Sequence, residues 1–173
     1  MSPRPEPPAA VYLKPGEVHI AQTPTVVTTV LGSCVSVTMF APAAGIGAIC
    51  HGLLPACREK RSCDGSCTEG FKYVECSIQR MAERFKKLGI PPHEIEVKLF
   101  GGADMISAKG RGNATNVGRQ NIDIALQALE GEGLTLATYD VGGNGGRKIH
   151  FYTHTGEVLL KRLQQTDLPD AAS

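Results

Sequence analysis

Two stretches of the chain carry apolar residues at the alternating three- and four-residue spacing of an amphipathic helix. The first covers residues 72–88 and ends before Gly89 and Pro91. The second covers residues 116–130 and ends at Gly131 and Gly133. The stripe residues are Val74, Ile78, Met81, Phe85 and Leu88 in the first stretch, and Val117, Ile122, Ala125, Leu126 and Leu129 in the second. We therefore predict two helices, each of which buries one face in the core.

Apolar runs rich in β-branched residues, bounded by glycine and proline, predict strands along the rest of the chain. The expected strands cover residues 11–20 (with a turn at Pro15-Gly16), 25–31, 35–40, 46–51, 95–100, 134–141, 147–153 and 157–163. The N-terminal half is therefore β-rich and the helices come later. This order indicates the α/β class in its α+β form.

The two ends of the chain differ in composition from its middle. Residues 1–10 are rich in proline and predict a disordered N-terminal arm, and residues 164–173 form a polar C-terminal tail. The chain of 173 residues suits one domain, which we expect over residues 11–163. A domain of this size buries enough surface to form a core without disulfides or metals.

Charge and hydropathy argue against several kinds of partner. The net charge is +1, so nothing favours binding to nucleic acid. No apolar run approaches the ~18 residues of a membrane span, which predicts no direct membrane insertion. The N-terminus carries no apolar signal core. We therefore expect a cytoplasmic protein whose six cysteines are mostly free thiols.

The strongest candidate for chemistry is Cys34, within the segment TTVLGSCVSV at residues 28–37. The cysteine follows a Gly-Ser pair at the start of an apolar run, where small neighbours leave room for a substrate. A thiol attacks only as the thiolate, so it needs a base or a positive field nearby. Taken alone, a cysteine in an apolar strand is more often a core residue than a nucleophile.

His51 is the candidate base, because it ends the strand that follows the strand of Cys34. Antiparallel pairing of these two strands would bring the imidazole back beside the thiol. A hydroxyl that precedes Cys34 would orient the imidazole, which is the third role in a catalytic triad. Thr28 and Thr29 are adjacent and face opposite sides of a strand, and we choose Thr28. Among the other histidines, the sequence leaves His150 open as an alternative.

A cysteine-rich loop is expected over residues 56–70 and contains Cys57, Cys63 and Cys67. The spacings of these cysteines do not match the close pairs typical of zinc sites, although Cys50 or His51 would complete a set of four ligands. A surface loop with free thiols is therefore favoured over a structural metal.

Several of these segments together resemble CheD, the chemoreceptor glutamine deamidase family of bacterial chemotaxis. The most specific matches are Leu31-Gly32-Ser33-Cys34-Val35, and His51 followed by Leu53-Leu54-Pro55. Weaker matches are Gly101-Gly102-Ala103, Asn116-Val117-Gly118 and Gly145-Gly146-Arg147-Lys148. The cysteine-rich segment is a departure from the family pattern, in which we expect a shorter linker.

The resemblance implies a layered α/β sandwich with mixed and antiparallel sheets, similar to that of cysteine deamidases of the cytotoxic necrotizing factor type. It also implies a catalytic triad of Cys34, His51 and Thr28. The thiolate of Cys34 would attack the carboxamide of a receptor glutamine, and water would hydrolyse the resulting thioester to glutamate without any cofactor or metal. The implied partners are the cytoplasmic region of methyl-accepting chemoreceptors, and CheC, a phosphatase of the phosphorylated response regulator.

Two other functions stay open at this point. An adaptor without catalytic activity would bind a CheC-type phosphatase through the cleft that holds Cys34 and His51. The presence of both residues argues against the loss of catalytic activity. A metal-binding or redox-sensing module would be built from cysteines alone, namely Cys50, Cys57, Cys63 and Cys67.

Overall fold

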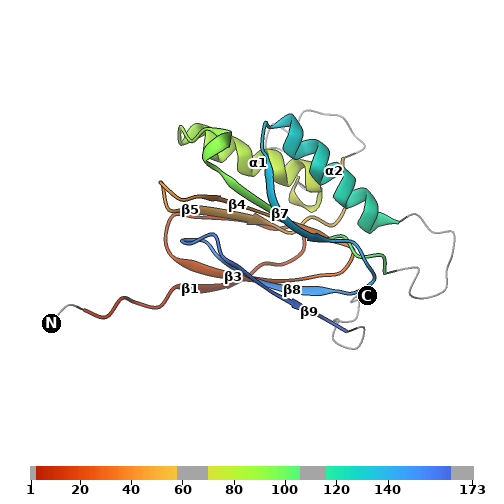
Figure 1. Cartoon of the computed structure of the whole chain (residues 1–173), viewed down its shortest axis with the longest axis horizontal. Coiled ribbons are helices and arrows are strands. Elements are labelled where there is room, and N and C mark those ends of the chain that lie inside the picture. Colours follow the sequence, from red (N-terminus) through yellow and green to blue (C-terminus); the bar gives the residue numbers. More distant parts are fainter. Residues whose placement is uncertain (1–2, 58–69, 106–115, 165–173) are drawn as a thin grey trace.

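A computed structural model of the chain describes residues 3–57, 70–105 and 116–164. Two β-sheets lie face to face, and the helices α1 (Val74–Lys87) and α2 (Val117–Gly131) cover the outer face of one of them (Figure 1). The molecule therefore has three layers, which confirms the expected α+β class and the layered sandwich with mixed sheets. Both helices lie within two residues of their predicted boundaries, because most of each apolar stripe packs against the sheet. Leu88 and Leu126, which were expected on the buried faces, are exposed. No helix among the described residues is long and apolar enough to span a membrane.

The sheet beneath the helices has five strands in the order β2-β5-β4-β6-β7. The strands are β2 (Val18–Ala21), β4 (Val35–Ala41), β5 (Ile46–Cys50), β6 (Glu96–Gly101) and β7 (Leu136–Val141). β6 and β7 are parallel, and the other neighbouring pairs are antiparallel. Every residue of the central strand β4 is buried, because this strand has the helices on one face and the second sheet on the other.

The second sheet has four strands in the order β1-β3-β8-β9. The strands are β1 (Ala9–Tyr12), β3 (Thr25–Leu31), β8 (Arg147–Tyr152) and β9 (Val158–Arg162). Along β3 and β8, buried residues alternate with partly exposed ones. One face of this sheet therefore packs against the five-stranded sheet, while the other face carries the partly exposed side chains.

Two apolar cores follow from this layering. The larger core lies between the helices and the five-stranded sheet and includes Val35, Val37, Met39, Ile78 and Phe85. The smaller core lies between the two sheets and includes Leu31, Ile49, Phe100, Ile149 and Phe151. Successive residues of β4 and β5 thus point into different cores, and the inter-sheet side is the one that carries the candidate chemistry.

The beginning of the chain differs from the prediction in two ways. β1 starts at Ala9, inside the segment expected to be a disordered arm, because it pairs in parallel with β3 through its backbone. The single strand expected over residues 11–20 is two strands, β1 and β2, which belong to different sheets. The turn at Pro15 and Gly16 carries the chain from one sheet to the other. Residues 58–69 of the expected cysteine-rich loop and residues 165–173 of the expected tail lie outside the described residues.

Candidate active site

Cys34 lies in the short connection from β3 to β4, where the chain passes from the four-stranded to the five-stranded sheet. The end of β6 fixes this connection: Gly102 N–H donates to the Cys34 carbonyl (2.8 Å), and Ala103 N–H donates to the Gly32 carbonyl (3.0 Å). Gly101 has a φ of 101°, and a Cβ there would collide with the Cys34 carbonyl oxygen. Only glycine permits this close approach. The Cys34 side chain is partly buried and packs against the inter-sheet core.

His51 follows β5 and lies on the same face of the sheet as Cys34. Val35 and Gly52 form an antiparallel bridge, with hydrogen bonds of 3.0 and 2.9 Å in the two directions. This register puts His51 opposite Ser36, and Cys34 two residues before Ser36 on the same face. Thiol and imidazole are therefore diagonal neighbours across two strands. The predicted antiparallel pairing of the strands that adjoin Cys34 and His51 is confirmed.

The hydroxyl beside His51 is that of Thr29, and not that of Thr28, which we had chosen from the sequence. Thr29 Oγ1 lies 2.7 Å from His51 Nδ1, and both side chains are buried between the sheets. Thr28 points to the opposite face of β3, where its Oγ1 lies 2.8 Å from His150 Nδ1. The choice of Thr28 as the partner of His51 is therefore wrong, because the odd-numbered residues of β3 are those that face the five-stranded sheet. The same alternation places His150 away from the candidate site.

The hydrogen bonds of Thr29 fix the tautomer of His51. A threonine hydroxyl has one proton to donate. Thr29 Oγ1 donates it to the Leu13 carbonyl (2.8 Å), so it accepts from His51, and Nδ1 carries the hydrogen. Nε2 of the neutral ring then keeps a free lone pair. A base of this kind can take a proton from a neighbouring thiol.

Burial keeps both reacting groups uncharged. It raises the pKa of Cys34 to about 11, against the smaller opposite effect of a hydrogen bond with the backbone of Cys34 itself. It lowers the pKa of His51 to about 4, although the Leu13 carbonyl and the Glu17 carboxylate act in the opposite direction. The resting pair is therefore a neutral thiol and a neutral imidazole rather than an ion pair.

The connection from β1 to β2 holds His51 in place through three hydrogen bonds, a role that the sequence does not indicate. The Leu13 carbonyl accepts a hydrogen bond from the Thr29 hydroxyl, Gly16 N–H donates to the His51 carbonyl (2.8 Å), and His51 N–H donates to the Glu17 carbonyl (3.0 Å). The Pro15-Gly16 turn signal was visible in the sequence, but nothing in it indicated which strand end the turn would hold.

Of the other cysteines, Cys50 does not face this site. Cys50 is fully buried in the core on the helix side, while Cys34 packs on the inter-sheet side. Among the described residues, no cluster of three or more histidine, cysteine or acidic side chains could hold a metal ion. Cys63 and Cys67 lie outside the described residues, so the cysteine-rich module stays a prediction.

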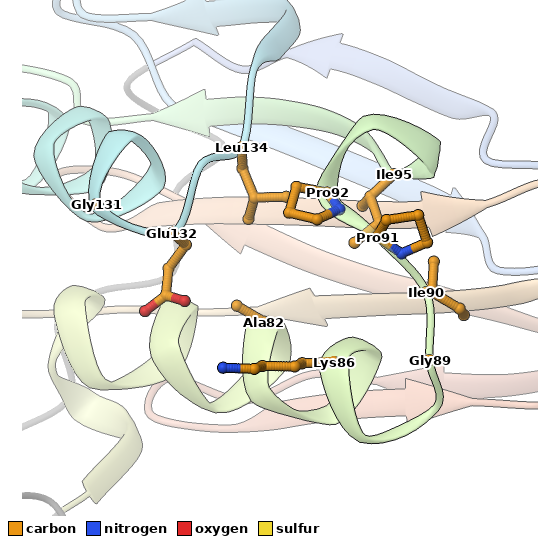
Figure 2. Close-up of a pocket in the computed structure, with 10 residues that line it drawn as sticks. All are labelled: Ala82, Lys86, Gly89, Ile90, Pro91, Pro92, Ile95, Gly131, Glu132 and Leu134. Carbon is orange, nitrogen blue, oxygen red and sulfur yellow. The ribbon is translucent and has the colours of Figure 1, made fainter.

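A separate pocket of about 450 Å³ lies between the C-terminal ends of α1 and α2 (Figure 2). Its lining includes Lys86, Pro92 and Glu132. The pocket adjoins the start of β6, whereas Cys34 contacts the end of that strand. It therefore contributes no residue to the thiol–imidazole pair.

A family model described as CheD chemotactic sensory transduction matches residues 53–162, more than half of the chain. The chain belongs to the CheD family. It is 57% identical over 157 residues to the probable chemoreceptor glutamine deamidase CheD 2 of Geobacter sulfurreducens, with 91% of this chain and 92% of the relative covered. It is 40% identical to the probable chemoreceptor glutamine deamidase CheD of Maridesulfovibrio salexigens, with 90% and 92% covered. It is 33% identical to the chemoreceptor glutamine deamidase CheD of Thermotoga maritima, with 86% and 88% covered.

Proposed function

We propose that this CheD-family chain is a protein-glutamine deamidase that converts glutamine side chains of methyl-accepting chemoreceptors to glutamate. The names of its relatives support the reaction and the substrate class. The observation that carries the chemistry is the Thr29–His51 hydrogen bond on the sheet face that also bears Cys34. It leaves a proton acceptor, Nε2, on a buried ring next to a thiol.

In this mechanism Cys34 is the nucleophile, His51 is the general base and Thr29 orients the imidazole. His51 Nε2 takes the thiol proton as the sulfur attacks the carbonyl carbon of the glutamine carboxamide. The tetrahedral intermediate then breaks its C–N bond, and the imidazolium returns the proton to the departing ammonia. A water molecule gives a proton to His51 and attacks the thioester. The C–S bond breaks, glutamate is released, and the thiol is restored.

The neutral resting state favours proton transfer during the attack, since neither group is charged beforehand. The oxyanion of the tetrahedral intermediate needs hydrogen-bond donors beside the sulfur. The backbone N–H groups of Ser33 and Cys34 are the candidates. Within the described part of the chain, neither of them donates to a backbone carbonyl.

The test is mass spectrometry of a glutamine-bearing cytoplasmic fragment of a chemoreceptor after incubation with the protein. We expect each converted glutamine to gain about one dalton with the wild type, and no gain with Cys34→Ala, because the thioester cannot form. Cys57→Ser is the matched control, since it removes another partly buried thiol, to which the mechanism gives no role. Conversion by Cys34→Ala at the wild-type rate would refute the mechanism. No conversion by the wild type on several receptors would refute the activity.

The proposal also includes the location of the reaction and a second protein partner. We place the reaction in the cytoplasm, where the helical signalling region of a chemoreceptor presents its glutamines, and we propose a CheC-type phosphatase as a second partner. The location and the second partner are both inferred from the resemblance to the CheD family. If both partners bind over Cys34, a CheC-type phosphatase should slow deamidation of the receptor fragment. Simultaneous binding without inhibition would contradict a shared binding surface.

A further inference from the structure

Asn121 of α2 joins the two backbone segments that carry the candidate catalytic pair. Its side chain is fully buried, although asparagine is a polar residue. Its Nδ2 donates to the Ser33 carbonyl (3.0 Å) and to the Leu53 carbonyl (3.0 Å). Ser33 immediately precedes Cys34, and Leu53 comes two residues after His51. One side chain from the helix layer thus ties together segments that are distant in sequence.

The orientation of this amide is fixed by its partners. Both neighbours are carbonyl oxygens, which only accept, so the NH₂ group has to face them and both of its hydrogens are used. The other amide atom, Oδ1, is buried and has no hydrogen-bond partner among the described residues. Turning the amide over would put an oxygen against two oxygens.

The unpaired Oδ1 indicates why an asparagine stands here. A buried acceptor without a partner destabilises a fold, and an apolar side chain of similar size would avoid that cost. The asparagine provides two N–H donors at the correct separation for the Ser33 and Leu53 carbonyls. Those carbonyls flank the nucleophile and the base rather than a distant part of the core.

We propose that Asn121 is a positioning residue that fixes the Cys34 connection relative to the His51 segment. The inference rests on the proposed function, because it assigns Cys34 and His51 their chemical roles. The Val35–Gly52 bridge sets the strand register, and Asn121 adds a cross-link between the residue before Cys34 and the second residue after His51. Small errors in the separation of nucleophile and base reduce the rate of proton transfer much more than they reduce substrate binding.

The test compares Asn121→Ala and Asn121→Leu with Asn116→Ala as the matched control. Asn116 caps the same helix by accepting from Arg119 N–H (2.9 Å), so its loss weakens α2 without touching Ser33 or Leu53. We expect both Asn121 variants to lower kcat by about 10- to 100-fold with KM nearly unchanged. Asn121→Leu fills the space of the amide and should unfold at a higher temperature than Asn121→Ala. Asn116→Ala should unfold at a lower temperature than the wild type and keep its kcat.

A second readout follows Cys34 itself, independently of deamidation. Alkylation of Cys34 by iodoacetamide, mapped by peptide mass spectrometry across a pH series, reports how well His51 assists the thiol. We expect the Asn121 variants and His51→Gln to share the pH profile of an unassisted thiol, and the wild type and Asn116→Ala to react faster near neutral pH. The inference would be overturned if the Asn121 variants kept the wild-type kcat and the wild-type alkylation rate. It would also be overturned if the loss of kcat in all three asparagine variants were proportional to the fall in their unfolding temperatures. If the wild type shows assisted alkylation but no deamidation, the proposed activity fails and the positioning role stands.

Discussion

The hydroxyl of Thr29 accepts from His51 Nδ1 and donates to the Leu13 carbonyl, so it determines both the tautomer and the orientation of the ring. Thr29→Val keeps the shape of the side chain and removes only the hydroxyl. We expect kcat for receptor deamidation to fall by about 10- to 100-fold, because the neutral ring can then carry its proton on Nε2. KM should change little. Steady-state kinetics on the receptor fragment measures both constants.

The adjacent residue provides the control for this prediction. Thr28→Val removes the same hydroxyl from the other face of β3, where it contacts His150, and should leave kcat within about twofold of the wild type. Thr29→Ser retains a hydroxyl and should recover most of the activity. Equal losses in Thr28→Val and Thr29→Val would mean that β3 as a whole, rather than the Thr29 hydroxyl, supports catalysis.

The sequence indicated Cys34, His51 and a pair of threonines, but it could not choose within the pair. Strand alternation requires that Thr28 and Thr29 face opposite ways, yet it does not say which of them faces the five-stranded sheet. That choice depends on the packing of Val27 and Leu31 against residues far along the chain. Asn121 was missed for the same reason, since its partners Ser33 and Leu53 are 88 and 68 residues away.

The buried imidazole of His51 also makes stability depend on pH. Burial lowers the pKa of this ring from 6.5 to about 4 in the folded protein. Between these two pH values the imidazole is therefore protonated in the unfolded chain and neutral in the folded one. Stability is therefore lost as the pH falls from 6.5 to about 4, with a contribution of about 3 kcal/mol. Urea unfolding at several pH values should show a steeper acid loss for the wild type than for His51→Gln. Parallel curves for the two proteins would contradict this assignment.

Among the elements, the junction between β7 and β8 depends on one buried arginine. Arg147 is 3% exposed, forms an ion pair with Asp140 (2.7 Å) and donates to the Gly142 carbonyl (2.9 Å). Arg147→Met should lower the free energy of unfolding by about 3–5 kcal/mol, because it leaves buried acceptors without donors. Arg162 contacts the same carboxylate but is 71% exposed, so Arg162→Met should cost less than about 1 kcal/mol. Urea titrations compare the two variants, and similar losses in both would refute the distinction.

The elements themselves were largely predictable, whereas their grouping into sheets was not. The spacing of apolar residues in α1 and α2, and the β-branched run of β3, are local signals that the structure confirms. The start of β1 has no such signal, because Ala9 and Ala10 are held by backbone pairing with β3. The sequence also could not show that β1 and β2 belong to different sheets, since sheet membership is decided by the partner strands.

In the molecule as a whole, the candidate site exists only while the two sheets keep their separation, because Thr29 comes from one sheet and His51 adjoins the other. Gly47 of β5 is a point of close contact between the sheets: a Cβ there would lie 2.5 Å from the Thr153 carbonyl oxygen and 2.7 Å from its Cα. Both are backbone atoms, and hydrogen bonds with Thr25 hold Thr153 to the four-stranded sheet. No side-chain rotation can therefore relieve the clash.

Gly47→Ala should consequently push the sheets apart. We expect the free energy of unfolding to fall by about 1–3 kcal/mol, as for other overpacked cores. We also expect kcat to fall while KM is retained, because the Thr29–His51 hydrogen bond spans the gap that widens. Gly131→Ala is the control, since a Cβ at that helical position meets no atom within 4 Å and should be neutral or slightly stabilising. Urea unfolding and deamidation kinetics measured on both variants test the idea. A Gly47→Ala protein that loses stability but keeps its kcat would show that the site tolerates a change in sheet separation.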